Sequence, residues 1–169
     1  MVTTPSYKGL RAASEASSRA KRRNRCQDTA PELLLRRELW RMGLRYRKNV
    51  ATLPGKPDVV FAGIKLAVFC DGDFWHGRDW TSRRAKLERG TNATYWLAKI
   101  ATNMERDRRV TDLLERDGWH VIRLWETDIK NNPYAAGCCV QSLVLARRME
   151  AVDPRDDYRS AGMGDYEVH

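Results

Sequence analysis

Residues 53–80 constrain the fold of this chain more strongly than any other stretch. The stretch begins with two turn-forming proline steps, in the hexapeptide LPGKPD, and such steps are strong markers of turns. Two short runs of β-forming residues follow, at residues 58–61 and 65–70, and residues 62–64 are short enough for a tight connection between them. The sequence therefore predicts a β-hairpin at the centre of the domain.

A dense cluster of polar and aromatic residues comes directly after the second run. A carboxylate at the head of one strand and carboxylates at the end of the next can converge at one edge of a sheet. Oxygen ligands of this kind suit a hard cation such as Mg2+, and a nearby histidine can supply general acid–base chemistry. The pattern is typical of a metal-dependent phosphodiesterase site. Its candidate members are Asp58, Asp71, Asp73, Phe74, Trp75 and His76.

The overall charge favours a polyanionic partner. The 169 residues carry a formal net charge of +9, with a pI near 9.7. Nucleic acid is the first partner class that such a charge suggests, and an anionic membrane surface is the second. A basic protein that does not bind nucleic acid is the remaining alternative. The length fits one domain with a sizeable core.

The composition also bears on the compartment. No apolar run approaches the ~20 residues that a membrane span needs, and no apolar segment follows the basic N-terminus as a secretory signal would require. The four cysteines lack CxxC spacing, so neither a zinc finger nor a disulfide framework is indicated. Reduced thiols are typical of the cytoplasm, and we expect a cytoplasmic protein.

The rest of the chain predicts helices and strands around the hairpin, in a single α/β unit. The first helix shows an apolar stripe that includes Leu33, Leu39 and Trp40, and residues 77–92 lack clear periodicity. The expected elements are a helix capped at residue 28 or 29 and ended by Gly43, a strand at 44–48, a loop at 49–56, an irregular excursion at 77–92, a long helix from Thr94 to Gly118, a strand at 119–125, a turn or short helix at 126–132 and a helix at 133–149.

Three regions are expected along the chain: a basic arm at residues 1–28, the main domain at 29–149 and a flexible tail at 150–169. The arm is rich in arginine and lysine, which suits contact with phosphates. A solvated arm without a role is the alternative. The arm residues that we expect to contact DNA are Arg19, Lys21, Arg22 and Arg23.

Two polar residues interrupt the apolar face of the long helix. Asn103 and Asp107 fall on nearly the same face as Trp96 and Ile100. Because polar groups that face a protein interior need hydrogen-bond partners, we expect this face to touch the site or a hydrogen-bonded support for it. We include Asn103 among the expected DNA contacts.

Five motifs in this order resemble the very-short-patch-repair (Vsr-type) DNA endonucleases, within the restriction-endonuclease-like PD-(D/E)xK group. The resemblance implies a restriction-endonuclease-like single domain with a central mixed β-sheet flanked by helices. The motifs are DTAPE at 28–32, LPGKPD at 53–58, VFCDGDFWHG at 68–77, YWLAKIATNMERDRR at 95–109 and GWHVIRLWE at 118–126.

The resemblance also implies roles for individual residues. Asp58 matches the carboxylate that binds Mg2+, and Cys70 stands where the family contributes a metal ligand through its backbone carbonyl. His76 matches the catalytic histidine. Glu32 matches a helix carboxylate that hydrogen-bonds water on the metal, although a simple charge at a helix N-terminus explains it equally well. Asp71 stands where some members carry a second histidine, so it could bind metal or orient His76.

Phe74, Trp75 and Trp96 match residues that, in the family, wedge into the base stack beside a mismatched pair. Unstacking costs a few kcal/mol, and less where pairing is already weak, which favours mismatched sites. The alternative is that these rings only pack beneath residues 77–92.

One family feature is missing. Family members hold a structural zinc with cysteine and histidine ligands, and the matching positions here are Asp73, Arg78, Trp80 and Thr127. Because zinc prefers sulfur and nitrogen ligands, we predict that this chain holds no zinc. We expect pairing of Arg78 with Asp79, and packing of Trp80, to replace it.

The resemblance implies a Mg2+-dependent DNA endonuclease that nicks one strand of double-stranded DNA 5′ to T in a T:G mismatch. A monomer with one site makes a single-strand nick easier to explain than a double-strand break. The alternatives are a restriction or phage-defence endonuclease without mismatch preference, because one fold carries many specificities, and an inactive DNA-binding module. A DNA-repair or methyltransferase partner system is left open.

Overall fold

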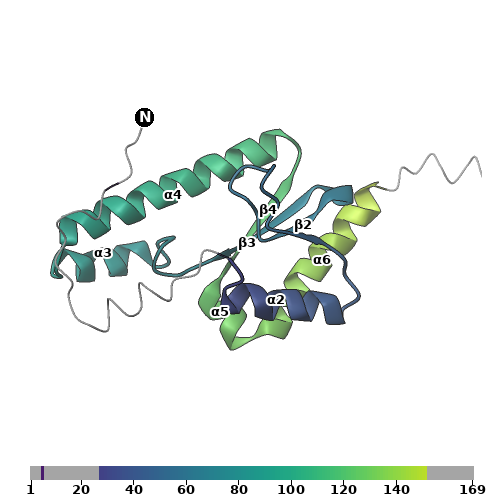
Figure 1. Ribbon diagram of the computed structural model, residues 1–169, viewed down its shortest axis with the longest axis horizontal. Coiled ribbons are helices and arrows are strands. Elements are labelled where there is room, and N and C mark those ends of the chain that lie inside the picture. Colours follow the sequence, from purple (N-terminus) through teal and green to yellow (C-terminus); the bar gives the residue numbers. More distant parts are fainter. Residues whose placement is uncertain (1–4, 6–26, 152–169) are drawn as a thin grey trace, which may run out of the picture.

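The computed structural model describes residue 5 and residues 27–151, which form an α/β domain (Figure 1). The predicted DNA contacts in the arm, and most of the predicted tail, lie outside these residues. The elements, in chain order, are α2 (Ala30–Arg41), β1 (Arg47–Lys48), β2 (Val59–Phe61), the 3-10 helix η1 (Ala62–Ile64), β3 (Leu66–Asp71), α3 (Trp80–Glu88), α4 (Ala93–Arg116), β4 (His120–Trp125), α5 (Glu126–Asn131) and α6 (Pro133–Ala151).

The strands form one four-stranded mixed sheet in the order β1-β2-β3-β4. β2 pairs with β3 antiparallel, with Val59 opposite Val68, which confirms the predicted hairpin. Its connection is η1, followed by Lys65 in the left-handed region at φ 47°. β3 pairs with β4 in parallel, and the chain between them runs through α3 and α4.

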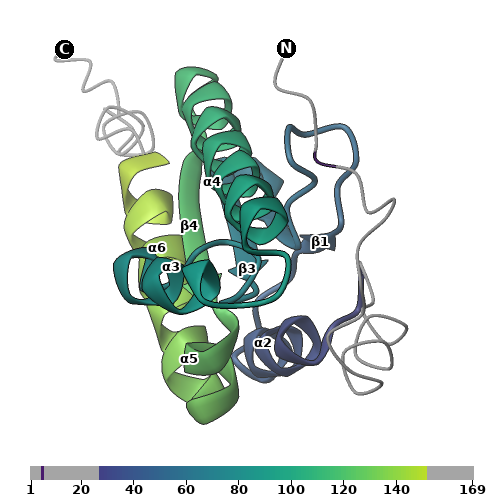
Figure 2. The same cartoon turned by 90° about the vertical axis from the view of Figure 1, so that its left-hand side faces the viewer.

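The sheet separates two apolar clusters, because successive side chains on a strand point to opposite faces. On β3, Leu66 and Val68 join α2, α5 and α6 in one cluster, whereas Ala67 and Phe69 join α4 in the other. Figure 1 and Figure 2 show α4 on one side of the sheet and the group of α2, α5 and α6 on the other. The predicted α/β class with helices flanking a mixed sheet is confirmed.

The first helix begins as predicted but turns a different face inward. Thr29 is the N-cap and forms a capping box with Glu32, which satisfies two backbone donors that the helix start leaves free. The buried side chains include Leu35 and Leu39, whereas Leu33 is 52% exposed and Trp40 is 60% exposed. The predicted apolar stripe was therefore wrong in part. Charged residues such as Glu32 are buried on the inward face, because an ion pair with Arg36 compensates for the loss of hydration.

The prediction of an irregular excursion at residues 77–92 was also wrong, because Trp80–Glu88 forms the helix α3. This helix has no buried residue, so its sequence carries no apolar periodicity for a pattern to detect. Its arginine, lysine, alanine and leucine residues are good helix formers. α3 packs beside α4 (Figure 1), outside the two apolar clusters, as expected of a segment that is not part of the core.

Several element boundaries also differ. The strand expected at 44–48 is reduced to β1, and the last helix continues to Ala151, past the predicted domain boundary at 149. The long helix and the strand after it agree with the prediction to within a few residues. In the described residues, no helix has the length and apolar character that crossing a membrane requires.

Gly55 and Gly43 allow a test of how tightly the LPGKPD turn packs on the domain. Both have positive φ, at +70° and +75°. A Cβ on Gly55 would lie 2.5 Å from Val110 Cγ1, whereas a Cβ on Gly43 would meet nothing within 4 Å. We expect Gly43→Ala to lower the free energy of unfolding by about 1 kcal/mol through backbone strain alone.

Gly55→Ala should lower it by about 2–4 kcal/mol, because overpacking adds to the same strain. Urea unfolding of the two variants measures the difference. Equal losses would show that the turn does not pack closely on α4.

Candidate active site

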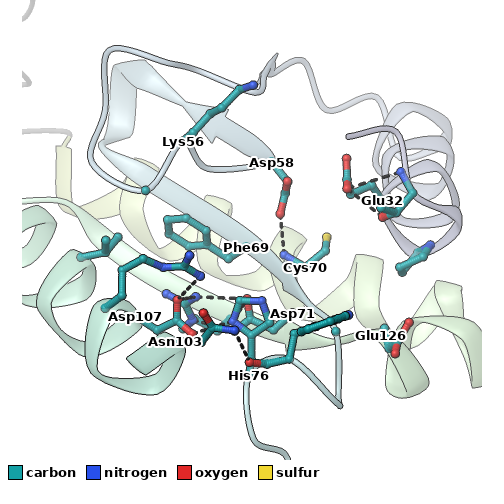
Figure 3. A pocket seen from close by; sticks show the side chains of 18 of the residues that line it. Glu32, Lys56, Asp58, Phe69, Cys70, Asp71, His76, Asn103, Asp107 and Glu126 are labelled. Atoms are coloured by element: carbon teal, nitrogen blue, oxygen red, sulfur yellow. Dashed lines mark hydrogen bonds and ion pairs between the residues drawn. The ribbon is translucent and has the colours of Figure 1, made fainter. Parts of the chain in front are cut away.

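A cleft opens where the start of β2 meets the end of β3. Its volume is about 650 Å³, and its wall includes side chains from α2, the segment that leads into β2, the strand β3, the turn after β3 and α4 (Figure 3). The cleft brings together all four residues predicted to be catalytic and two polar residues of the long helix: Glu32, Asp58, Asp71, His76, Asn103 and Asp107.

Asp58 owes its position to the hairpin. It immediately precedes β2, and its N–H donates to the Val68 carbonyl at 3.0 Å, so its side chain lies beside the end of β3. There Asp58 Oδ2 accepts a hydrogen bond from the Cys70 N–H at 2.7 Å. Burial raises the pKa of Asp58 to about 6; the Cys70 hydrogen bond opposes this, and the nearby charges of Glu32 and Asp71 add to it. A carboxylate in this environment favours a bound cation.

Cys70 contributes backbone atoms to this part of the site. Its side chain packs against the apolar cluster of α2, α5 and α6, and burial raises the pKa of its thiol well above the usual range. The thiol therefore stays protonated, whereas the backbone N–H reaches Asp58. The role predicted for the Cys70 carbonyl stays a prediction.

Glu32 is 4% exposed, and both of its carboxylate oxygens already accept hydrogen bonds. Oε1 accepts from Thr29 Oγ1 at 2.7 Å, and Oε2 accepts from the Asp28 N–H at 3.0 Å and from Arg36 Nη2 at 3.0 Å. Glu32 thus has the structural role that was the alternative for it. Because it also lines the cleft, its predicted role toward water on a metal is untested.

A compact turn directly after β3 places His76 in the cleft. The N–H groups of Trp75 and His76 both donate to the Gly72 carbonyl at 3.1 Å. Gly77 follows at φ +74°, and a Cβ there would lie 2.6 Å from Met104 Sδ, so only glycine lets the turn lie this close to α4. The turn places His76 between β3 and α4.

The His76 ring faces two carboxylates. Its Nδ1 lies 2.5 Å from Asp107 Oδ2 and 3.6 Å from Asp71 Oδ1. Burial acts to raise the pKa of Asp107, but the hydrogen bond with His76 and the charges of His76, Arg123 and Arg106 outweigh it and lower the pKa. An ionised carboxylate only accepts hydrogen bonds, so Nδ1 carries the proton and Nε2 is left as an acceptor when the ring is neutral.

The sequence-based prediction missed one residue of this cluster. Arg123 of β4 donates from Nε to Asp71 Oδ2 at 2.6 Å and from Nη2 to Asp71 Oδ1 at 3.1 Å. Its Nη2 also lies 3.1 Å from Asp107 Oδ1. The available signal was a charged residue between Val121 and Trp125, on one side of an otherwise apolar strand. The partners could not be found in this way, because they lie on other elements.

Asn103 and Asp107 confirm the prediction that the polar side of the long helix supports the site. Asn103 is 7% exposed, and its Nδ2 donates to the Trp75 carbonyl at 2.9 Å. Asn103 thus holds the turn that carries His76. Its predicted contact with DNA is not tested by this bond and stays a prediction.

The three aromatic residues predicted to face DNA pack against one another. Ring centroids of Phe74 and Trp75 are 5.1 Å apart, those of Phe74 and Trp96 are 5.3 Å apart, and those of Trp75 and Trp96 are 5.8 Å apart. All three residues are half-buried, and Phe74 and Trp75 line the cleft. The cluster thus has both an internal packing role and a face toward the cleft.

Comparisons with known proteins agree with this architecture. The family model described as "DNA mismatch endonuclease Vsr" matches residues 13–82. A type II nicking enzyme of Neisseria meningitidis serogroup C, V.NmeDIP, is 44% identical over 125 residues, which cover 74% of this chain and 81% of that protein. The chain belongs to the Vsr family.

Two other relatives extend the comparison. The type II nicking enzyme V.HpaIIP of Haemophilus parainfluenzae is 43% identical over 119 residues, covering 70% of this chain and 83% of that protein. The DNA mismatch endonuclease Vsr of Escherichia coli strain K12 is 36% identical over 104 residues, covering 62% of this chain and 65% of that protein. The predicted family is confirmed, and the observed sheet and helices agree with the restriction-endonuclease-like domain expected of a Vsr-family chain.

The donor set in the cleft fits the Mg2+ that the Vsr family implies. Asp58 is a desolvated carboxylate next to two further acidic residues, and oxygen ligands are those that Mg2+ prefers. Within residues 27–151, no group of three or more His, Cys, Asp or Glu residues is arranged to hold a metal. Mg2+ does not need such a cage, because it commonly takes one or two carboxylates together with water and phosphate oxygens.

The zinc positions of the Vsr family, in contrast, do not fit zinc here. Asp73 accepts a hydrogen bond from Thr127 Oγ1 and lies 3.6 Å from Arg78 Nη1, while Arg78 Nη2 reaches Asp128 Oδ1 at 2.8 Å. Arg78 thus pairs with Asp73 and Asp128, and the prediction that Asp79 would pair with it was wrong. We call Asp73, Arg78, Thr127 and Asp128 the polar staple. It ties the turn after β3 to α5.

The raised pKa of Asp58 predicts a variant that is more stable than wild type. Burying the ionised Asp58 carboxylate lowers the free energy of unfolding. This loss begins as the pH rises through the unfolded pKa of about 3.9 and is complete above the folded pKa of about 6. Asp58→Asn removes this charge and keeps an acceptor for the Cys70 N–H. We expect the free energy of unfolding at pH 8 to rise by about 1–3 kcal/mol.

The gain should vanish below pH 4, where Asp58 is protonated in both states. Saturating Mg2+ should stabilise wild type but not the variant and so narrow the gap at pH 8. Urea unfolding at both pH values, with and without Mg2+, measures this. A gap that does not depend on pH would contradict the electrostatic origin.

The polar staple predicts stability that does not depend on zinc. Thr127→Val removes the hydroxyl donor to Asp73 with little change of shape, and we expect a loss of about 1–2 kcal/mol in the free energy of unfolding. Thr94→Val, at an exposed position early in α4, is the control. Wild type should unfold at the same denaturant concentration with chelator and with added zinc. Stabilisation by stoichiometric zinc would overturn the prediction.

Proposed function

We propose that this chain is a Mg2+-dependent DNA endonuclease that hydrolyses a phosphodiester bond and nicks one strand of duplex DNA. The observation that carries the proposal is the convergence of Asp58 with the His76–Asp107 pair in one cleft of a Vsr-family chain. Two of the relatives are named nicking enzymes, which favours a single-strand break. If the chain acts as a monomer, this cleft would cut one strand at a time, which is easier to reconcile with a nick than with a double-strand break.

His76 is suited to move the proton of the reaction. Asp107 holds Nδ1 at 2.5 Å, so the neutral ring presents Nε2 as a base. A water molecule that attacks the phosphorus atom would form the new P–O bond and transfer its proton to Nε2. The bond from phosphorus to the sugar oxygen then breaks, that oxygen takes up a proton from solvent water as it leaves, and His76 returns its proton to solvent. Asp107 orients the ring and stabilises its charged form, as acidic partners of catalytic histidines do.

Asp58 and the Cys70 carbonyl would hold the metal. When bound, Mg2+ would supply positive charge that offsets the charge developing on the phosphate oxygens. Asp58 itself is desolvated and lies near Glu32 and Asp71, so a cation there relieves repulsion among three carboxylates. Glu32 is held in place by its capping box, and its negative charge acts on Asp58.

The walls of the cleft also favour a nucleic acid. Lys56, Lys99 and Arg106 line it together with the acidic residues, and basic side chains contribute most of the affinity for a phosphate backbone. With the net charge of +9, this supports duplex DNA as the substrate. We also propose a cytoplasmic location, and a repair or methyltransferase partner stays a hypothesis.

We further propose that the preferred site is a T:G mismatch, with the nick 5′ to the T. The cluster of Phe74, Trp75 and Trp96 supports this proposal, because apolar and aromatic side chains can insert between bases and do so more easily at weakened pairs. The E. coli relative is named a DNA mismatch endonuclease. Arg83, which lies 5.7 Å from the Phe74 ring centroid, adds positive charge beside the cluster.

A strand-resolved cleavage assay tests both proposals. End-labelled duplexes that are matched, T:G-mismatched or otherwise mispaired would be incubated with wild type, Asp58→Ala or the control Asp112→Ala, an exposed position on α4. We expect one nick, on the T strand of the T:G duplex, that requires Mg2+. Asp58→Ala should lower the rate at least about 10³-fold while DNA binding persists, and Asp112→Ala should cut like wild type.

The other outcomes separate the alternatives. Cleavage of matched duplex at a defined sequence would assign the chain to restriction or phage defence. Binding by wild type without cleavage of any duplex would mean an inactive DNA-binding module. Unchanged cleavage by Asp58→Ala would show that the metal site is elsewhere.

A further inference from the structure

Arg123 connects two carboxylates that come from different elements and flank the same histidine nitrogen. Asp71 closes β3 and Asp107 lies in α4, and Arg123 contacts the first through Nε and Nη2 and the second through Nη2. Both carboxylates face His76 Nδ1, at 3.6 Å and 2.5 Å. The two carboxylates therefore lie at the Nδ1 edge of the His76 ring, and Arg123 contacts both of them.

The position of the Arg123 guanidinium is itself tightly determined. Phe69 and Arg123 are register partners across the β3–β4 pair, and the guanidinium carbon lies 4.5 Å from the centroid of the Phe69 ring. The Arg123 side chain is 23% exposed. Cation–π contact and burial of this kind strengthen an arginine's ion pairs relative to those on an open surface.

The charges in this cluster also need Arg123. Asp71 and Asp107 are both largely buried, with side chains 7% and 13% exposed. Two carboxylates at one site repel each other, and the Arg123 guanidinium, which contacts both of them, offsets that repulsion. Without Arg123 this repulsion would move Asp107 away from His76 Nδ1, and the ring would lose the acceptor that fixes the tautomer with Nε2 as a base.

We propose that Arg123 is a positioning residue for His76. Its planar guanidinium holds Asp71 and Asp107 on either side of Nδ1, and so fixes both the orientation and the tautomer of the ring. This inference rests on the proposed nuclease function. It assigns to β4 a part in the reaction, although no atom of Arg123 needs to touch the DNA.

The shape of the side chain matters in this arrangement as well as its charge. The guanidinium offers several N–H donors in a fixed plane, which allows it to bond two carboxylates at once, whereas lysine offers a single ammonium. Arg123→Lys therefore keeps the charge but loses the geometry. A simple structural ion pair would tolerate this exchange far better.

The first experiment compares the nicking kinetics of wild type, Arg123→Lys, Arg123→Met and the control Arg116→Lys. Arg116 is exposed near the C-terminal end of α4 and lines neither the cleft nor the His76 cluster. We expect Arg123→Lys to lower kcat about 10- to 100-fold, the usual cost of losing a group that orients a reacting side chain. KM for the duplex should stay unchanged, because DNA contacts are intact, and Arg116→Lys should match wild type.

The second experiment observes the ring directly and does not depend on activity. The chain has three histidines, so ¹⁵N-histidine spectra are simple, and His76→Gln identifies the His76 signals. Wild type and Arg116→Lys should show His76 protonated at Nδ1. Arg123→Lys and Arg123→Met should show a mixture with the Nε2-protonated tautomer.

If Arg123→Met does not fold, the double variant Asp71→Asn with Arg123→Met removes the unpaired carboxylate together with the cation, and it replaces the single variant in both experiments. Normal kcat and a single Nδ1-protonated tautomer in a folded Arg123 variant would overturn the proposal. Failure of the proposed function would look different, since wild type itself would then not nick DNA.

Discussion

Asp58 and Cys70 lie side by side because β2 and β3 pair antiparallel, with Val59 opposite Val68. The Asp58 N–H donates to the Val68 carbonyl, and this ladder leads the Asp58 carboxylate to the Cys70 N–H at 2.7 Å. The tight η1 connection keeps the register fixed, and a shift by one residue would turn every side chain of the hairpin to the opposite face. Every other group in the cleft is placed relative to this pair of strands.

The cleft has two chemically different halves (Figure 3). The half next to α2 is acidic, with Asp58 and Glu32, and it suits a cation. The half next to α4 contains a histidine in an ion-pair cluster with Asp107 and Arg123, and it suits transfer of a proton. The end of β3 lies between the two halves.

The polar staple shows how the turn after β3 can be held without zinc. A carboxylate, a hydroxyl and a guanidinium connect it to α5 through Asp73, Thr127 and Arg78. Each of these bonds is weaker than a metal–thiolate bond, but together they join the turn after β3 to α5 without a cofactor. The His76 turn is held on its other side by Asn103 of α4, so two independent sets of polar contacts hold it in place.

Local sequence was enough to determine the hairpin, the capping box at Thr29, the long amphipathic helix and the presence of Asp58 and His76 near one sheet edge, because these depend on residues close in the chain. The polar face of the long helix also indicated that Asn103 and Asp107 needed partners. Sequence could not reveal α3, which buries no residue, or the inward face of α2. Only the tertiary structure decided that Arg123 meets Asp71, 52 residues away, and that Asp107 meets His76, 31 residues away. Such contacts arise from strand pairing and helix packing. The residues that surround Arg123 or Asp107 in the sequence therefore do not indicate which distant side chain each one meets.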